Sequence, residues 1–507
     1  MRRRSRSVRL TAFLIALPLG AVPVIERGGV RNAASLLPQG MPGGGLAPGM
    51  RVAIRGLDLA GTTRVVVAAA GGAWYAPVLE SSPVRAVAVI PAGVPPGTAR
   101  LSIERGDERS APAAVRVGTN SPGLFSLDGS GRGAASTRRF ARGSHVVLPA
   151  TGMGGRGARV LVWIGGVLAQ VAAAVSEPGR EPGVDALAFV IPHNAPAGCA
   201  VPVQARIGTG PVSNAVTVEI EGAGECLTAA RFDEWIPRGG RSAMLLAFTL
   251  AARVAVDRQL AVSRGEGFAA AFLEGSHQAG IAIPAEGTCM VYASSNPVAG
   301  LRDRLRELLA GEGRVLDAGR VWAESGGRRE DLSARSSGVL YRHAGGAMPA
   351  AHEIVRPAFF AGNSVTVKGS GGKDAGPFEK RVALPEPLTW PVRDAPEEVD
   401  RTRPLRLAWK ASNRGQPVFA GGLVLERTAR AAAGFVCRGR SGSETIEAPS
   451  HVLEFLPQAR GEVERSLGFL FLATVPESAP AMHLDIEGLN GMLAVGAYIE
   501  VRSARFR

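Results

Sequence analysis

The sequence is poor in lysine and in aromatic residues, and each shortage narrows the classes of protein that fit it. Aromatic residues are 5% of the 507 residues, and lysine stands only at positions 368, 373, 380 and 410. The net charge of +14 therefore depends on arginines, which form no dense block beyond the N-terminus and do not alternate with aromatics. Nucleic-acid-binding proteins usually show such a block or a known motif, so we expect no nucleic-acid partner. A loose attraction to acidic polysaccharide or lipopolysaccharide is the better interpretation of the charge.

Cysteine is also scarce, and its spacing excludes the common zinc sites. The four residues, Cys199, Cys226, Cys289 and Cys437, form neither a CxxC pair nor a cluster with histidine. We therefore expect no metal and no other cofactor. An even number of cysteines in an exported chain favours disulfides, and four allow three connectivities. We prefer Cys199–Cys226 with Cys289–Cys437, because the first two are close in sequence and would tie a strand to the end of its own domain.

The N-terminus has the pattern of a secretory signal peptide over residues 1–22. The basic segment MRRRSRSVR precedes the apolar stretch LTAFLIALPLGAV (10–22), which ends near the small residues Gly20 and Ala21. This stretch is too short to span a membrane, and the only comparable run, MLLAFTLAARVAV (244–256), is short and contains Arg253. We expect an extracellular or cell-surface protein, with the periplasm as the alternative location and no transmembrane span in the mature chain. A basic tail leading into a first strand is the other interpretation of these residues.

The first half of the chain contains a tandem repeat of about a hundred residues. LAPGMRVAIRGLDLAG (46–61) aligns with FARGSHVVLPATGMGG (140–155), VIPAGVPPG (89–97) with VIPHNAPAG (190–198), and AAVRV (113–117) with NAVTV (214–218). Alternating apolar residues between closely spaced glycine and proline turns are typical of β-sandwiches. We predict two immunoglobulin-like sandwiches, at 28–120 and 121–222.

Several stretches in this half resemble a known family in matching order. They are VRNAAS (30–35), SPGLFSLDGSGRGAA (121–135), VWIGGVLAQV (162–171), PGVDALAFVIP (182–192) and GCAVPVQARIG (198–208). Together they resemble the uncharacterised IPT/TIG-like tandem β-sandwich domains of exported proteins from Solibacter-type acidobacteria. This resemblance covers about residues 28–222 and implies an extracellular immunoglobulin-like module without known catalytic residues.

The second half is expected to be a bridging segment at 223–300 followed by a C-terminal β-rich domain at 301–507. LRDRLRELLA (301–310) has the apolar spacing of a short helix, and PSHVLEFLP (449–457) predicts a short turn-helix. The stretches PAFFAGNSVTVKGSGGKDAGPF (357–378), RPLRLAWKA (403–411) and GFVC (434–437) resemble a second uncharacterised β-rich region that follows such sandwiches. That resemblance implies a strand cysteine at Cys437 and supports Cys289 as its partner. The predicted fold class is mainly β: tandem immunoglobulin-like sandwiches plus a sandwich or jelly-roll-like C-terminal region with one or two short helices.

Five motifs resemble chemical sites, and each lacks a part that the chemistry requires. Gly152-x-Gly154-x-x-Gly157 matches the dinucleotide fingerprint, but the strand-like ARVLVWIGG follows it where a helix should begin, so a hairpin turn is favoured. KGSGGKDAG (368–376) lacks the first glycine and the Ser/Thr of a phosphate loop, and indicates a long hairpin loop or a surface binding loop. His352-Glu353 lacks the second histidine of a zinc protease, Ser441 lacks a complete nucleophile elbow, and the turn at Asp128 offers one carboxylate only.

No catalytic residue is therefore predicted, although a constellation assembled from distant positions in the C-terminal region stays open. Trp74 and Tyr75 lie beside glycines and are the best candidates for ligand contact, whereas Trp163 and Trp409 lie in apolar strand patterns and are expected in the core. The sequence predicts an exported, non-enzymatic protein with a binding, adhesion or scaffolding role. Its expected partners are cell-envelope or extracellular polysaccharide, or other surface proteins. The alternative is a secreted carbohydrate-binding or carbohydrate-active protein with its site in the C-terminal region.

Overall fold

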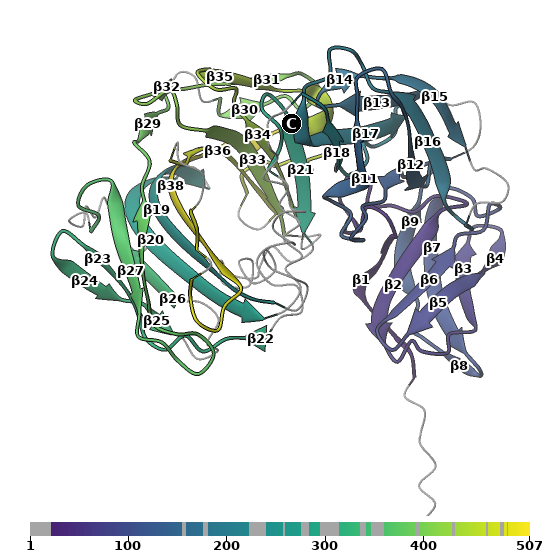
Figure 1. Cartoon of the computed structure of the whole chain (residues 1–507). Coiled ribbons are helices and arrows are strands. Elements are labelled where there is room, and N and C mark those ends of the chain that lie inside the picture. The colour runs from purple at the N-terminus through teal and green to yellow at the C-terminus, as the bar shows by residue number, and fades with distance from the viewer. Residues whose placement is uncertain are drawn as a thin grey trace, which may run out of the picture.

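The computed structural model is almost entirely β and consists of two small sandwiches followed by a larger C-terminal region (Figure 1). It describes residues 22–154, 159–175, 181–222, 240–256, 259–274, 283–294, 314–334, 341–345, 359–391, 396–427, 431–462, 465–476, 481–483 and 485–507. No helix among these residues has the length and hydropathy needed to cross a lipid bilayer. The predicted mainly-β fold class with tandem sandwiches is confirmed.

The first sandwich pairs a sheet of order β1-β2-β6-β5 with a sheet of order β4-β3-β7-β8, in which β9 also pairs with β7. Its strands are β1 (Val24–Asn32), β2 (Arg51–Leu57), β3 (Arg64–Ala69), β4 (Gly72–Ala76), β5 (Val78–Ser82), β6 (Arg85–Val89), β7 (Gly97–Arg105), β8 (Glu108–Arg109) and β9 (Ala113–Val117). Alternate residues of both sheets point inward and form one core that includes Val52, Ile54, Val65, Val67 and Leu101. Each such fully buried side chain contributes about 1.5–3 kcal/mol.

The second sandwich repeats this architecture. Its sheets have the orders β10-β12-β16-β15 and β11-β18-β17-β13-β14. The strands are β10 (Gly123–Leu124), β11 (Ala134–Phe140), β12 (His145–Thr151), β13 (Val160–Ile164), β14 (Val167–Leu168), β15 (Gln170–Val175), β16 (Asp185–Val190), β17 (Gly198–Ile207) and β18 (Val216–Ile220). In the second copy, β10, β12, β16 and β15 take the places of β1, β2, β6 and β5, and β14, β13, β17 and β18 take those of β4, β3, β7 and β9. Strands β8 and β11 each belong to one copy only. The two copies therefore share a strand order, as the sequence repeat predicts.

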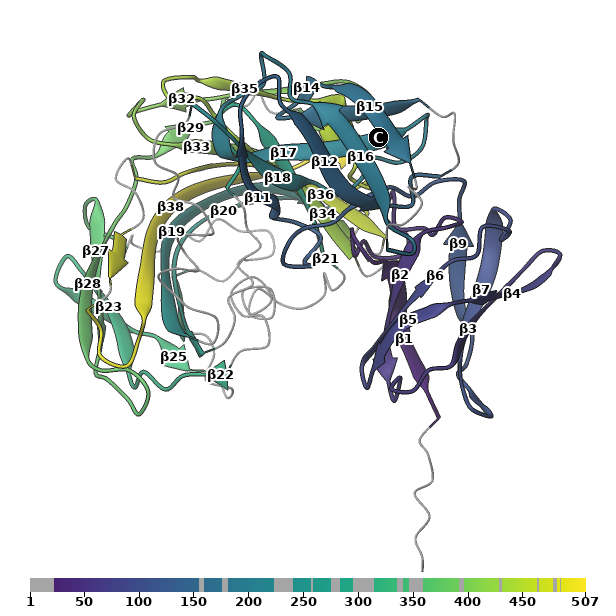
Figure 2. The same cartoon turned by 45° about the vertical axis from the view of Figure 1, so that its right-hand side comes forward.

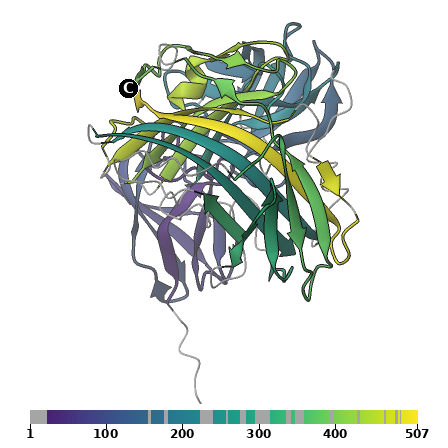
Figure 3. The same ribbon diagram turned by 90° about the vertical axis from the view of Figure 1, so that its left-hand side faces the viewer.

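The C-terminal region is built on one large curved sheet of order β21-β34-β33-β36-β38-β19-β20-β26-β25, to which β22 and β37 add (Figure 3). Its strands are β19 (Arg241–Val256), β20 (Gln259–Glu274), β21 (Cys289–Ser294), β22 (Arg314–Val315), β25 (Ser333–Ala334), β26 (Tyr341–Gly345), β33 (Val418–Glu426), β34 (Ala431–Arg438), β36 (Ser466–Thr474), β37 (Ala481–His483) and β38 (Gly491–Ser503). The long strands β19 and β38 run parallel and join the two halves of this sheet.

Smaller sheets cover the convex side of the large sheet and divide its core in two. The sheet β24-β23-β27-β28 packs over one half, and the pairs β29-β32, β30-β39 and β31-β35, together with helix α3, pack over the other. These elements are β23 (Val321–Ser325), β24 (Arg328–Asp331), β27 (Ser364–Gly369), β28 (Phe378–Ala383), β29 (Leu388–Thr389), β30 (Glu398–Val399), β31 (Leu405–Ala408), β32 (Lys410–Ala411), β35 (Thr445–Ala448), α3 (Ser450–Glu454) and β39 (Arg505–Phe506). Helix α3 lies within the predicted turn-helix at 449–457, and the helix expected at 301–310 lies outside the described residues.

The expected bridging segment at 223–300 differs from what the structure shows. Residues 241–274 form the two 16-residue strands β19 and β20 in the middle of the large sheet, and residues 289–294 form β21 at its edge. MLLAFTLAARVAV is thus part of a strand in which Leu245 and Ala247 are buried in the core while Met244 and Leu246, on the opposite face, are half-buried. Apolar residues on both faces hide the alternation of polar and apolar positions that marks a strand in a sequence.

Candidate functional site

The two aromatic side chains predicted to contact a ligand point to opposite sides of strand β4. Trp74 pairs with Val67 and packs against the core of the first sandwich, whereas Tyr75 pairs with Val66 on the outer face and is 60% exposed. Neighbouring residues of a strand face opposite ways, so only one of two adjacent aromatics can reach solvent. The structure therefore gives Trp74 a packing role and leaves Tyr75 as the candidate for ligand contact.

Tyr75 begins a row of alternating charges that crosses four strands of the outer face. The Arg64 guanidinium lies over the Tyr75 ring, 5.1 Å from its centroid, and its Nε is 3.4 Å from Oε2 of Glu104. Arg109 lies on the other side of Glu104, with 4.0 Å between Nη1 and Oε1, and its Nε donates a 2.9 Å hydrogen bond to Ser102. About half of each arginine side chain remains exposed, 55% for Arg64 and 54% for Arg109. The row holds these side chains in place while keeping them accessible.

A second part of the same face is flat and carries two further arginines. Ala73, Ala68, Arg100 and Ala114 lie side by side on β4, β3, β7 and β9, and Arg116 is a diagonal neighbour of Arg100. Both of these arginines are exposed. Neither forms a side-chain ion pair with any residue that the structure describes. The outer face therefore presents an aromatic ring, a strip of alanines and an excess of positive charge. Figures 1 and 2 show that this sheet faces away from the C-terminal region.

The equivalent face of the second sandwich is an interface within the chain itself. Trp163 pairs with Gln204 one position before a hairpin turn, as Ala68 pairs with Arg100 one position before the corresponding turn of the first copy. The Trp163 ring stacks on His451 of α3, with 4.3 Å between centroids and 6° between planes. Trp163 was expected in a core, and this expectation is wrong. It points outward from its sandwich, because its neighbours Val162 and Ile164 take the inward positions.

Charge accompanies the ring stacking at this interface. Arg206 lies 5.6 Å from the centroid of Trp163 and forms an ion pair with Glu454, also on α3. His451 is buried, and this burial, helped by the positive charge of Arg206, lowers the pKa of His451 from 6.5 to about 3. The imidazole is therefore neutral at physiological pH. This face of the second copy binds an aromatic ring and a carboxylate that lie three residues apart on one helix.

The glycine motif that resembles a dinucleotide fingerprint forms a connection between two sheets. It follows β12, and the next strand, β13, belongs to the other sheet of the sandwich, so the expected hairpin is wrong although the turn itself is present. Gly152 has a positive φ of 72°, and a Cβ atom there would lie 2.3 Å from the carbonyl oxygen of Ser121. The glycine is required because the chain passes directly against the linker between the two sandwiches, and its last member, Gly157, lies outside the described residues.

The other resemblances to chemical sites resolve into structural turns where they are described. KGSGGKDAG forms the loop of the antiparallel pair β27–β28, and the buried Asp374 in this loop accepts a 2.9 Å hydrogen bond from the backbone N–H of Asp317. Asp128 accepts hydrogen bonds from Ser126 and Ser130 within its own turn. Ser441 donates a hydrogen bond to Glu286. His352 and Glu353 lie outside the described residues.

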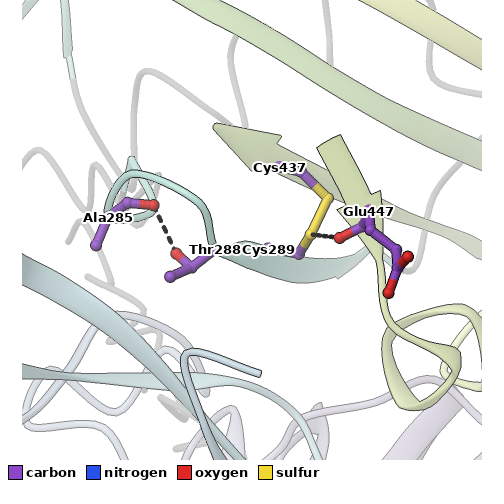
Figure 4. The surroundings of a disulfide bond; sticks show 5 residues. All are labelled: Ala285, Thr288, Cys289, Cys437 and Glu447. Atoms are coloured by element: carbon purple, nitrogen blue, oxygen red, sulfur yellow. Dashed lines mark hydrogen bonds between the residues drawn. A yellow bond between two sulfur atoms is a disulfide. The ribbon is translucent and has the colours of Figure 1, made fainter. Parts of the chain in front are cut away.

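The structure contains the disulfide Cys289–Cys437, which joins directly opposed residues of β21 and β34 (Figure 4). Both cysteines are buried in the core of the C-terminal region, and the Cys289 sulfur lies 3.8 Å from the carbonyl oxygen of Glu447. Cys199 also belongs to a disulfide. Cys226 lies outside the described residues, so the pairing Cys199–Cys226 stays a prediction. Disulfides of this kind are typical of exported proteins.

One face of the sheet formed by β23, β27 and β28 carries two carboxylates, Glu324 and Glu379, next to Lys368. Trp322 donates a 2.8 Å hydrogen bond to Glu324, and Lys368 contacts both Glu324, at 2.9 Å, and Glu379, at 3.4 Å. The hydrogen bond from Lys368 holds the pKa of Glu324 below its usual value. A glycosidase acid needs a raised pKa, so Glu324 does not suit that role. Among the described residues, no group of three or more His, Cys, Asp or Glu could hold a metal ion.

Sequence reasoning found Tyr75 but missed the arginines around it. In GTARLSIER (97–105) and AAVRV (113–117), Arg100 and Arg116 lie between apolar residues, which predicts that each faces solvent on its own strand. Arg64 begins the apolar run RVVVAA (64–69), which has no such alternation. Alternation alone does not say which strands are neighbours, and only the pairing of β3, β7 and β9 places these three arginines on one face.

No family model and no curated protein matches this chain. The resemblance to IPT/TIG-like domains of acidobacteria therefore stays a prediction. Among solved structures, the surface glycan-binding protein SGBP-B of the Bacteroides ovatus mixed-linkage glucan utilization locus, in complex with a heptasaccharide, aligns at 13% identity over 59% of this chain and 64% of its own, with a TM-score of 0.21. PbSGBP-B of Prevotella bryantii aligns at 10% identity over 38% and 40%, with a TM-score of 0.16. Domains 5–6 of the S-layer protein SbsC align at 17% identity over 40% and 100%, with a TM-score of 0.19.

Proposed function

We propose that this chain is an exported surface or secreted binding protein, and that the outer face of the first sandwich binds polysaccharide. The observation that carries the proposal is the exposure of Tyr75 on a flat sheet face beside the small side chains of Ala68 and Ala73. An aromatic ring held in place offers a large contact area to a sugar ring at little entropic cost. The disulfide Cys289–Cys437 supports the exported location.

The role proposed is binding, adhesion or scaffolding rather than catalysis. The candidate face contains aromatic, small and cationic side chains. Its single carboxylate, that of Glu104, forms an ion pair with Arg64. General acid–base hydrolysis of a glycosidic bond needs two carboxyl groups, so this face suits recognition. The contact between Trp163 and His451 fixes the second sandwich against the C-terminal region, which suits a spacer that presents the first sandwich outward.

Isothermal titration of residues 22–507 against polysaccharides of the cell envelope and extracellular matrix tests the proposal. Tyr75→Ala should weaken binding about tenfold or more, which corresponds to ~1.4 kcal/mol. Leu57→Ala is the matched control, because Leu57 is also 60% exposed in the same sandwich but lies on the sheet that contains β2. Binding that is unchanged in Tyr75→Ala, or weakened equally in both variants, would contradict the proposed site.

A further inference from the structure

The positive charge on the candidate face is only partly neutralised by the residues that the structure describes. Four arginines, Arg64, Arg100, Arg109 and Arg116, share the face with one carboxylate, that of Glu104. Glu104 forms ion pairs with Arg64 and Arg109. Charged side chains without a partner in an ordered sheet remain solvated and available to an external anion.

Arg100 and Arg116 are too far from Glu104 for a strong electrostatic interaction. Arg100 and Glu104 lie on the same strand four residues apart, which is about 13 Å along an extended chain. This exceeds the screening length of about 8 Å at physiological ionic strength. Arg116 lies on the far side of Arg100, as its diagonal neighbour on β9, so it is no closer to the carboxylate. The pair Arg100–Arg116 therefore forms a cationic area in which Arg100 lies between Ala68 and Ala114.

The second sandwich shows what this sheet face can bind. There, Trp163 stacks on the His451 ring while Arg206 pairs with the Glu454 carboxylate. The occupant thus combines a flat ring with a carboxylate. On the first sandwich Tyr75 supplies the aromatic surface and the two free arginines supply the cations. The position of Trp163 is taken by Ala68, so in the row of Arg100 the described strands β3 and β4 carry only the small side chains of Ala68 and Ala73.

We propose that the first sandwich binds an acidic polysaccharide, whose sugar ring stacks on Tyr75 while its anionic groups pair with Arg100 and Arg116. This inference rests on the proposed function and adds the class of ligand. Guanidinium groups pair with carboxylates and sulfates through two parallel hydrogen bonds, which an ammonium group cannot form in the same way. Diagonal neighbours on adjacent strands are about 7–8 Å apart, so the two cations can contact different anionic groups of one polymer.

The test compares polygalacturonate, dextran sulfate and neutral dextran in titrations of residues 22–507 at 50 and 150 mM salt. Arg100→Ala/Arg116→Ala should weaken polygalacturonate binding at least tenfold and reduce its dependence on salt, with dextran binding unchanged. The matched control is Arg55→Ala/Arg85→Ala, which also removes two positive charges, from paired positions on the other sheet of the same sandwich. Equal thermal unfolding of the two double variants shows that both are folded. Preference for polygalacturonate over dextran sulfate assigns the ligand to carboxylated sugars, and the reverse assigns it to sulfated ones.

The outcomes separate this inference from the proposed function. Equal binding of neutral and acidic polymers, lost in Tyr75→Ala but kept in Arg100→Ala/Arg116→Ala, would leave the proposed function standing and overturn the acidic ligand. Binding of no polysaccharide would overturn both. Binding of polyglutamate as tight as that of polygalacturonate, insensitive to Tyr75→Ala, would indicate a nonspecific polyanion surface or an acidic protein partner and would overturn the inference.

Discussion

The imidazole of His451 lies parallel to the indole of Trp163, with 4.3 Å between the ring centroids, and this contact joins the second sandwich to the C-terminal region. The two residues are 288 positions apart in the sequence (451 − 163). Arg206 and Glu454 add an ion pair beside the stacked rings. Because ring stacking and a partly buried ion pair hold the second sandwich, we expect it to move together with the C-terminal region as one body.

The buried His451 makes stability depend on pH. Its pKa is about 3 in the folded protein and about 6.5 in an unfolded chain, so between these values only the unfolded state takes up the proton. The contribution of the neutral His451 to the free energy of unfolding is complete above pH 6.5 and is lost as the pH falls toward 3. The free energy of unfolding of both proteins should fall when the pH is lowered from 7.5 to 4.5. We expect this decrease to be about 2–3 kcal/mol smaller in His451→Phe, which keeps a flat ring, than in the natural protein.

Urea unfolding at the two pH values measures this difference. His145→Gln serves as the control, since His145 is exposed on β12. An equal loss in the natural protein and in His451→Phe would show that His451 does not contribute.

Removing the Trp163 ring should loosen the attachment of the second sandwich. We expect Trp163→Ala to lower the free energy of unfolding by about 2–3 kcal/mol, less than for a fully buried tryptophan because the ring is half-buried. Small-angle X-ray scattering should show a larger radius of gyration, since the ring stacking that holds the sandwich against α3 is then lost. Leu168→Ala is the control, because Leu168 is the exposed neighbour of Trp163 on the same face. A radius unchanged in Trp163→Ala would refute the anchoring role.

The disulfide should contribute through the long chain segment that it closes. Cys289 and Cys437 are 148 positions apart. Loop-closure entropy for such a length predicts a loss of up to about 5 kcal/mol, and measured losses for native disulfides are about 2–5 kcal/mol. We expect Cys289→Ser/Cys437→Ser to unfold at lower temperature by calorimetry, with the first two sandwiches unaffected. A coincident shift of all transitions would instead show that the three units unfold together.

Gly152 provides a test of why the nucleotide-like motif is rich in glycine. We expect Gly152→Ala to destabilise the protein by more than the 1–2 kcal/mol that a positive φ costs, because the new methyl group would also meet the Ser121 carbonyl. Gly129→Ala is the control, with a φ of 68° and nothing within 4 Å of the added Cβ. Equal effects of the two substitutions in urea unfolding would exclude the close approach as the cause.

The two small sandwiches could be predicted because their strands are half-exposed. Alternation such as that of Val52 and Ile54, with repeated turns between strands, identifies the element type and the inward face from local residues alone. The centre of the C-terminal region could not be predicted in this way. The largely apolar run MLLAFTLAA (244–252) occupies both faces of β19, and a run without alternation does not distinguish a strand from other apolar segments.

The mainly-β class and the duplicated sandwich could be predicted from the sequence, because both follow from the spacing of residues along the chain. Which of the adjacent Trp74 and Tyr75 is exposed, and which sheet faces meet, follow only from the packing of the strands and domains. That packing placed Trp163 on an outer face against His451, although both lie in apolar patterns, and it left the corresponding face of the first copy open with Arg100 and Arg116 side by side. The reason is physical: strand alternation fixes which side chains point the same way within one strand, whereas strand order and domain packing, set by contacts between distant residues, fix what lies opposite them.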